Sequence, residues 1–484
     1  MEQRNRTPFV LALGLGDVFL MTVAATISPQ LTARGARAGA SSVLLWLLAA
    51  VFFLVPHVLA VADLSSRYAE QGGIYAWSRR AFGPLHGFVC AWCLWLNNLF
   101  FFPAVLLFAA PNLLTALGPR FTHLSDSPTY SAVFVLTLLW FSIGMNVIGL
   151  GAARWLQNLT TAGVWGTSGL LIALGVSAWA AGGSATSFAP AALVPRQDML
   201  GTLALWSAMC FALSGYEVVA NVREEIRRPE RAIPLGIFLA GAVATLVYVL
   251  GSASILVAVP PEALSERSGV ADAVELMSRR IGVSGLGALT GACLALVGFA
   301  LTTSWVAGSA RVPYAAGADR IMPPSLASLH PRFRTPHVAL VVQGAASSLL
   351  FLVSLFLPMG GSRTTVREAY DLTFNLTILI YFVPYIYMFL ALARLRDDRT
   401  SDAGPRFRIP GGRGGVLLTA ISGFLATAIA MALLFVPPSG TPNVFKYEAN
   451  LILQSAGLLA VGFLFYARAR GHRKVRTISE VSCE

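Results

Sequence analysis

The chain has 484 residues, of which 56% are apolar and only 12% are charged, and its mean hydropathy is +0.68. This composition excludes a water-soluble globular protein and is typical of a chain whose solvent is mostly lipid. The net charge of +12 favours membrane topology and anionic lipid headgroups as its cause, and we expect no nucleic-acid partner.

Apolar segments long enough to cross about 30 Å of hydrocarbon recur along the whole chain, about twelve in all. We expect spanning helices near residues 9–30, 41–63, 86–110, 130–150, 155–180, 198–222, 234–259, 284–310, 338–358, 370–392, 415–437 and 447–467. The longest polar interval, 312–336, is too short to form a soluble domain. The sequence therefore predicts an all-α integral membrane protein with a single membrane domain over residues 1–484.

The topology follows from the basic residues. Arg4 and Arg6 precede an apolar run that is longer than the hydrophobic region of a typical signal peptide, so we interpret it as the first spanning helix. When alternate loops are assigned to opposite sides, most of the 35 Lys and Arg residues fall on the side of the two termini. The positive-inside rule then predicts a multi-pass protein of the cytoplasmic membrane with both termini, including a short tail at 469–484, in the cytoplasm.

Cysteine gives little functional information. Cys90 and Cys93 form a C-x-x-C, but no further ligands or thioredoxin-like context accompany them, so close packing is the favoured reading. We expect no cofactor and no resident metal.

Few polar residues interrupt the apolar segments, and each is costly there, by about 2.5 to 3.5 kcal/mol for a charge at a helix centre. Asp17 lies in GLGD of the first segment, and Glu217 lies in SGYE of the sixth. Glycine lets a membrane helix unwind, and the freed backbone groups must then face a cavity. The positive end of a half-helix suits a carboxylate ligand. The alternative is that Gly14, Gly16 and Gly215 allow close packing of unbroken helices.

The two interrupted helices open two halves of the chain, helices one to five and six to ten. This spacing favours inverted repeats, over 1–182 and 197–396, with a binding site near the midplane. The helices over 413–468 are then additions to the repeats.

Four motifs resemble the amino acid-polyamine-organocation transporters. They are FALSGYEVVANVREEIRRPERAIPLGI at the sixth helix, EQGGIYAWSRRAFGPLHGFVCAWCLWLNN at the third, SARVPYAAGADRIMP after the eighth and FRIPGG before the eleventh. Their order matches the family, and the resemblance covers most of the chain. Within the family, VAATIS and VPHVLAVADLSSRYAEQGGIYAW look closest to the glutamate/GABA antiporter-like permeases.

The resemblance implies a ten-helix inverted-repeat core of the leucine-transporter type plus two C-terminal helices. It implies a secondary active transporter, not an enzyme, that moves amino acids or related amines by alternating access. Carried over by position, the first helix breaks at 20–23 and the sixth at 212–216. The implied substrate-binding residues are Leu20, Met21, Thr22, Val23, Phe211, Ala212, Ser214, Gly215 and Tyr216. Many members have Gly-Ser/Thr-Gly at the first break, whereas this chain has Leu20-Met21-Thr22. The glutamate/GABA subgroup that it resembles also lacks those glycines.

The coupling mechanism is open between exchange for a counter-substrate and proton coupling. The chain has no lysine before Lys446, so the fifth-helix lysine that some members are thought to use for proton coupling is absent. Glu217 is the candidate titratable group, or else a permanent gate partner, and Asp17 is a gating candidate. Thr302 and Thr303 are the sodium-ligand candidates, with hydroxyls bonded to the preceding helical turn as the alternative.

Three other functions compete with amino-acid exchange. A polyamine or other organocation uptake symporter fits the same family. A channel also lines its pore with polar groups at broken helices. An intramembrane aspartyl protease would use GLGD with Asp371, but that resemblance expects Y-D before G-x-G-D in adjacent helices, and here the order is reversed.

Overall fold

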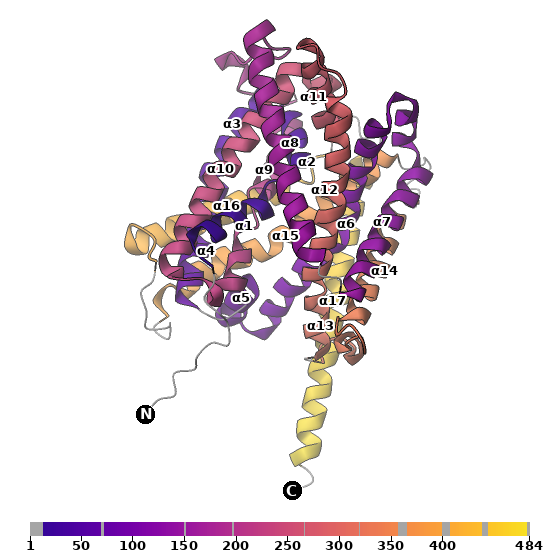
Figure 1. Ribbon diagram of the computed structural model, residues 1–484. Helices are drawn as coiled ribbons and strands as arrows, with labels where there is room; N and C mark the ends of the chain where they lie inside the picture. Colours follow the sequence, from indigo (N-terminus) through magenta and orange to yellow (C-terminus); the bar gives the residue numbers. More distant parts are fainter. Residues whose placement is uncertain are drawn as a thin grey trace. The chain divides into compact units, whose positions relative to one another are not determined.

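The computed structural model describes residues 13–68, 72–149, 152–195, 198–265, 267–318, 320–356, 365–398, 407–437 and 444–481. Across these ranges the regular elements are helices, and the one extended contact is an isolated bridge between Leu13 and Ile226. Figure 1 shows this all-helical architecture in chain order. The predicted fold class is confirmed.

Eleven helices in the described part of the chain are long and apolar enough to span a membrane, and a twelfth, α1 (Leu15–Thr26), is shorter. The spans are Ser41–Arg67, Pro84–Leu117, Pro128–Ile148, Asn158–Gly182, Met199–Ala220, Pro229–Ala258, Leu286–Ala318, His337–Phe356, Val366–Asp397, Gly412–Leu433 and Tyr447–Arg470. Each expected segment overlaps one of these helices. The expected tail at 469–484 continues the last helix as far as Val481.

Helix starts follow from local sequence. Pro84, Pro128 and Pro229 each stand at the first position of a helix, where proline's missing N–H costs nothing and its fixed φ suits the turn. The Ser127 hydroxyl also accepts from the Tyr130 N–H and caps the second of these helices. The long apolar runs between such starts become the spans.

Contacts divide the chain into two compact units. The first comprises residues 1–90, 187–253 and 382–433, and its boundaries fall inside α6, α10 and α15. Its elements are α1, α2 (Pro29–Ala36), α3 (Ser41–Ala49), the π-helical turn η1 (Ala50–Leu54), α4 (Val55–Arg67), α5 (Ile74–Phe82), η3 (Pro190–Ala192), α9 (Met199–Ala212), η4 (Tyr216–Glu225), α10 (Pro229–Ala258), η7 (Leu395–Asp397) and α16 (Gly412–Leu433). Within it, α16 packs on both α4 and α9, and η4 packs on α1 and α4.

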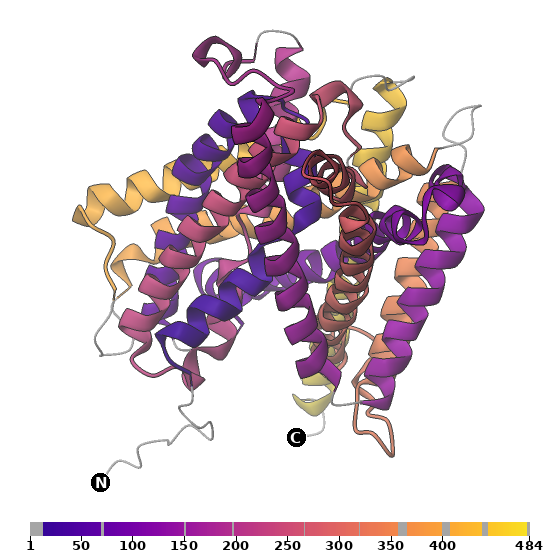
Figure 2. The same cartoon turned by 45° about the horizontal axis from the view of Figure 1, so that its top comes forward.

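The second unit comprises residues 91–186, 254–381 and 434–484. Its elements are α6 (Pro84–Leu117) from residue 91 on, η2 (Pro119–Asp126), α7 (Pro128–Ile148), α8 (Ala152–Gly182), η5 (Pro261–Ala263), α11 (Gly269–Arg280), α12 (Leu286–Ser309), α13 (Arg311–Ala318), η6 (Pro324–Ala327), α14 (His337–Phe356), α15 (Val366–Arg394) as far as residue 381, and α17 (Val444–Val481). The rest of α15, from residue 382 on, belongs to the first unit. Helices α7 and α14 lie side by side in both views (Figure 1 and Figure 2). Each unit joins segments of both expected repeats, 1–182 and 197–396, whose inverted symmetry stays a prediction.

Candidate substrate and coupling site

Helix α9 breaks where the sequence predicted. Its last residue is Ala212, and residues 213–215, which we call the second break, are not helical before η4 begins at Tyr216. The Ser214 hydroxyl donates to the Phe211 carbonyl over 2.6 Å, which satisfies one of the carbonyls freed at the helix end. Gly215 has φ +96°, a conformation that favours glycine. SGYE therefore ends one helix and turns the chain into a second.

The first helix breaks later than expected. Helix α1 is continuous through 20–23 and ends at Thr26, so the break expected there is wrong in position. Residues 27–28, which we call the first break, are extended, and α2 begins at Pro29. Proline disfavours the helical conformation of the residue before it, and Ser28 accordingly has φ −135° and ψ 119°. The sequence signal for this break is Pro29, not a glycine.

Tyr248 on α10 bridges the first break. Its hydroxyl donates to the Thr26 carbonyl over 2.8 Å and accepts from the Ser28 N–H at 2.9 Å. The ring stacks on Trp46 with centroids 4.4 Å apart. One side chain thus satisfies backbone groups on both sides of the interruption, which apolar surroundings require.

Tyr385 on α15 bonds one backbone group and one side chain at the second break. Its hydroxyl accepts from the Gly215 N–H at 3.0 Å and donates to Glu217 Oε2 at 2.8 Å. The two breaks are adjacent, because a β-carbon on Gly215 would lie 3.7 Å from Thr26 Cγ2. Both breaks and both tyrosines belong to the first unit.

His57 was not among the residues predicted from the sequence. This residue lies on α4 directly after the π-helical turn η1, is fully buried, and places Nε2 3.3 Å from Glu217 Oε2. Its ring meets Tyr216 and Tyr385 edge to face, with centroids 5.5 and 4.8 Å apart. The available signal was a lone histidine inside the apolar run of a spanning segment, VPHVLA.

The predicted first-helix residues share a helical stretch but not one environment. Leu20 is 54% exposed, Met21 is intermediate, and Thr22 and Val23 are buried. The Thr22 hydroxyl donates to the Val18 carbonyl of the preceding turn. In the sixth helix, Phe211 is half-buried at the end of α9, and Tyr216 is fully buried against His57. The roles of these residues in binding stay predictions.

Asp17 lies near the start of α1, where it is exposed and its Oδ2 accepts from the Gly14 N–H at 2.8 Å. The carboxylate thus caps its own helix. The adjoining Leu13 carbonyl accepts from the Arg227 N–H at 2.8 Å, which ties the start of α1 to the segment after η4. The gating role expected for Asp17 stays a prediction.

Thr302 and Thr303 lie on α12 in the second unit. Their hydroxyls donate to the carbonyls of Gly298 and Phe299 one turn earlier, each over 2.9 Å. The Thr303 hydroxyl also meets the Ser142 hydroxyl on α7 at 2.8 Å. These contacts match the alternative weighed for both threonines, bonding to the preceding turn.

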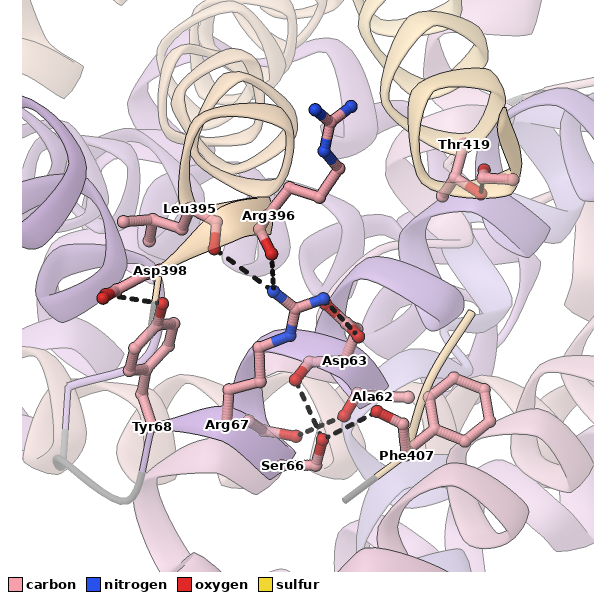
Figure 3. A network of polar contacts seen from close by, with 12 residues as sticks. Ala62, Asp63, Ser66, Arg67, Tyr68, Leu395, Arg396, Asp398, Phe407 and Thr419 are labelled. Carbon is pink, nitrogen blue, oxygen red and sulfur yellow. Dashed lines mark hydrogen bonds and ion pairs between the residues drawn. The ribbon is translucent and has the colours of Figure 1, made fainter. Parts of the chain in front are cut away.

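A second polar cluster joins the end of α4 to the end of α15 and η7, and we call it the α4–α15 clamp (Figure 3). Arg67 pairs with the fully buried Asp63 at 2.7 Å and donates to the carbonyls of Leu395 and Arg396 at 3.2 and 3.1 Å. A cation there complements the negative end of α15 and fills its orphan acceptors.

Tyr68 extends the clamp. Its hydroxyl donates to Asp398 Oδ2 at 3.1 Å, and the Arg80 guanidinium lies 4.6 Å from its ring centroid. Burial, followed by the bond to Asp398, raises the pKa of Tyr68 to about 12. The tyrosine therefore stays a hydrogen-bond donor throughout the physiological range.

The profile of the amino acid permease family matches residues 10–463, almost the whole chain. The chain belongs to the amino acid permease family. This assignment confirms the predicted superfamily and, with it, the prediction of a secondary transporter.

This amino acid permease resembles several transporters along most of its length. It is 28% identical to an uncharacterized transporter of Legionella pneumophila over 95% of this chain and 97% of the relative. It is 25% identical to a probable agmatine/putrescine antiporter of Lactococcus lactis, covering 83% of each chain. It is also 24% identical to a glutamate/gamma-aminobutyrate antiporter of the same species, over 88% of this chain and 85% of the relative.

These similarities exclude one of the functions weighed from the sequence. The relatives are transporters and antiporters, so the protease reading falls and the prediction that the permease is not an enzyme is confirmed. The permease is a multi-pass membrane protein that transports a small molecule such as an amino acid or an amine.

Proposed function

We propose that this permease exchanges amino acids or closely related amines across the cytoplasmic membrane by alternating access, with both termini in the cytoplasm. The two breaks carry the proposal. They lie next to each other in one unit, and a tyrosine hydroxyl from another helix bonds backbone at each break: Tyr248 at Thr26 and Ser28, and Tyr385 at Gly215. Adjacent unwound segments supply the backbone groups that bind a zwitterion in an apolar medium.

The chemistry of the breaks supports a ligand with a carboxylate. Helix α2 begins at Pro29 directly after the first break, so the positive end of its dipole is directed toward the break. Because the first break lies at 27–28 and not at 20–23, we expect the substrate contacts of this break near Thr26 and Ser28. We therefore place the substrate carboxylate at the start of α2 and the rest of the ligand near Ser214 and Gly215.

Two relatives favour exchange over uptake, because they are a probable agmatine/putrescine antiporter and a glutamate/gamma-aminobutyrate antiporter, and each matches more than four fifths of this chain. Those proteins handle agmatine with putrescine and glutamate with gamma-aminobutyrate, so carboxylate and amine ligands are both in the proposed class. Glu217 Oε2 already receives the Tyr385 hydroxyl and lies beside His57. We assign Glu217 to coupling rather than to holding the substrate amine.

Counterflow in proteoliposomes tests the proposal. Vesicles are loaded with one unlabelled compound at a time, from the twenty amino acids, GABA, agmatine and putrescine, and entry of a trace of the same labelled compound is followed. We expect transient accumulation of one compound or a small group. Protein-free vesicles control for leakage, and Ser455→Ala on α17, distant in sequence from both breaks, should behave like wild type.

The absence of accumulation for every compound, from protein that circular dichroism shows to be helical, would reject amino acids and amines as substrates. Uptake that proceeds at the same rate into empty vesicles would instead reject exchange and favour a symporter. Labelling of single introduced cysteines at either end of the chain by an impermeant reagent tests the orientation of the termini.

A further inference from the structure

We propose that His57 and Glu217 share a single exchangeable proton, and that this proton controls the geometry of the second break during transport. The inference deepens the proposed function, on which it rests, by naming His57 as the coupling partner of Glu217. It starts from the distance of 3.3 Å between His57 Nε2 and Glu217 Oε2.

The environment makes a lone charge on either side chain unfavourable. His57 is fully buried and Glu217 is 7% exposed. Aromatic rings surround the imidazole, with Phe53 centred 5.7 Å away in addition to Tyr216 and Tyr385. Burying an ion without a partner is costly, so the neutral states of the pair are favoured over singly charged ones.

Counting the protons on the imidazole and the carboxyl group shows that the pair gains or loses one. The pair is neutral overall when imidazolium faces carboxylate, or when neutral imidazole accepts from a protonated carboxyl group. Both states contain the same number of protons, and removing one leaves a buried carboxylate beside a neutral imidazole. Neither ring nitrogen of His57 makes a hydrogen bond among the described residues, and Nε2 approaches Glu217 Oε2 only at the ion-pair distance of 3.3 Å, so no neighbour fixes the tautomer. We therefore assign the exchangeable proton to the pair and not to either residue alone.

Other charged groups near the pair are engaged elsewhere. On α4 itself, Asp63 and Arg67 pair with each other in the clamp. On η4, the described charged side chains are Glu217 and Arg223, and Arg223 donates to the Ser66 carbonyl at 3.4 Å. The titratable groups that face the imidazole are Tyr216 on η4 and Tyr385 on α15. Helix α9 also carries the buried Cys210, and α16 carries Arg413 in its first turn, where it lies 3.6 Å from Asp397. On α1 the charged residue is Asp17, whose carboxylate caps the start of that helix.

Tyr385 links the protonation state of the pair to the backbone. Its hydroxyl donates to Glu217 and accepts from the Gly215 N–H, so a chain of two hydrogen bonds connects Glu217 to Gly215, the residue of the second break with positive φ. Protonating Glu217 weakens it as an acceptor from Tyr385, and ionising it strengthens that bond. A change of one proton is thereby transmitted to the segment that we assign to substrate binding.

The first experiment follows exchange against pH. Initial counterflow rates of glutamate, GABA and agmatine are measured between pH 5.5 and 8 for wild type, His57→Phe, His57→Gln, Glu217→Gln and the His57→Phe/Glu217→Gln double variant. Phenylalanine keeps the edge-to-face packing, and glutamine keeps polarity without titrating. In wild type, a one-proton step changes the rate by up to about tenfold per pH unit. We expect less than about a twofold change over the range in each single variant and in the double variant. His86→Gln, whose ring contacts Tyr387 at 3.1 Å, is the matched control and should keep the wild-type profile.

A second measurement does not depend on transport. Potentiometric difference titration of the purified proteins between pH 4 and 9 counts the protons bound by each. We expect His57→Phe, Glu217→Gln and the double variant each to lack the same single proton relative to wild type. If the double variant lacks the sum of two separate protons, the groups titrate independently and the inference is overturned. It is equally overturned if either His57 variant keeps the wild-type pH profile. If counterflow fails with all three compounds while the single shared proton is counted, the proton pair stands and the substrate assignment falls.

Discussion

Tyr385 donates a hydrogen bond of 2.8 Å to Glu217. The same hydroxyl accepts from the Gly215 N–H, so it satisfies a side chain and a backbone group that would otherwise be buried without a partner. The corresponding tyrosine at the first break, Tyr248, links a carbonyl and an N–H in the same way. Breaks in membrane helices are thus stabilised here by hydroxyls that come from other helices.

Replacing Tyr385 by phenylalanine should therefore impair the second break. Unpaired buried groups cost about 1 to 3 kcal/mol, and we expect exchange to slow by about tenfold or more. The measurement is the initial counterflow rate at one pH. Tyr130→Phe is the matched control, because its hydroxyl also bonds a backbone group, the Ala110 carbonyl, but within the second unit, which contains neither break. Equal rates for Tyr385→Phe and wild type would contradict the assignment.

Gly215→Ala tests the backbone conformation of the second break. The nearest side-chain atom, Thr26 Cγ2, leaves room for a methyl group, so the cost comes from the positive φ and should be about 1 to 2 kcal/mol. We expect a lower midpoint of thermal unfolding in detergent and slower exchange. Gly144→Ala on α7, where the space is open, should leave both unchanged. An unaltered midpoint for Gly215→Ala would mean that the segment relaxes to another conformation.

The α4–α15 clamp makes a different prediction. Arg67→Met leaves the fully buried Asp63 carboxylate without its cation, which should destabilise the permease by about 3 to 5 kcal/mol. The Asp63→Leu/Arg67→Met double variant should recover part of the loss, because no charge then remains buried. Recovery stays incomplete since the Leu395 and Arg396 carbonyls still lose their donor. Arg413→Met, on an arginine 79% exposed, should change the unfolding midpoint little. A double variant less stable than Arg67→Met alone would refute this account.

The stability that Glu275 on α11 contributes should depend on pH. Hydrogen bonds from Arg279 and then from the Gly287 N–H hold the pKa of its carboxyl below the usual 4.5. A lowered folded-state pKa contributes stability that is present above pH 4.5 and is lost as the pH falls through the folded value. Glu275→Gln should therefore increase amide hydrogen exchange at the start of α12 at pH 7. The difference from wild type should shrink below pH 4.5, and a difference that grows in acid would reverse the sign of this argument.

The sequence by itself determined where the chain lies in helices. Apolar runs of spanning length predicted every long helix, because burial in lipid depends on local hydropathy and length. It also located the second break, since glycine and small neighbours in SGYE weaken a helix locally. For the first break, resemblance pointed to 20–23, whereas Pro29 acts on Ser28 and sets the break at 27–28.

The partners of the polar residues were decided only by the tertiary structure. His57 and Glu217 are 160 positions apart in the sequence, and Tyr385 and Glu217 are 168 apart, so neither pair can be found from local sequence. Helical periodicity places a side chain on a face of its own helix, but it does not specify which other helix that face meets. That choice depends on how α4, η4 and α15 pack together, because only packing brings an imidazole, a carboxylate and a hydroxyl within bonding distance in a medium that leaves none of them to water.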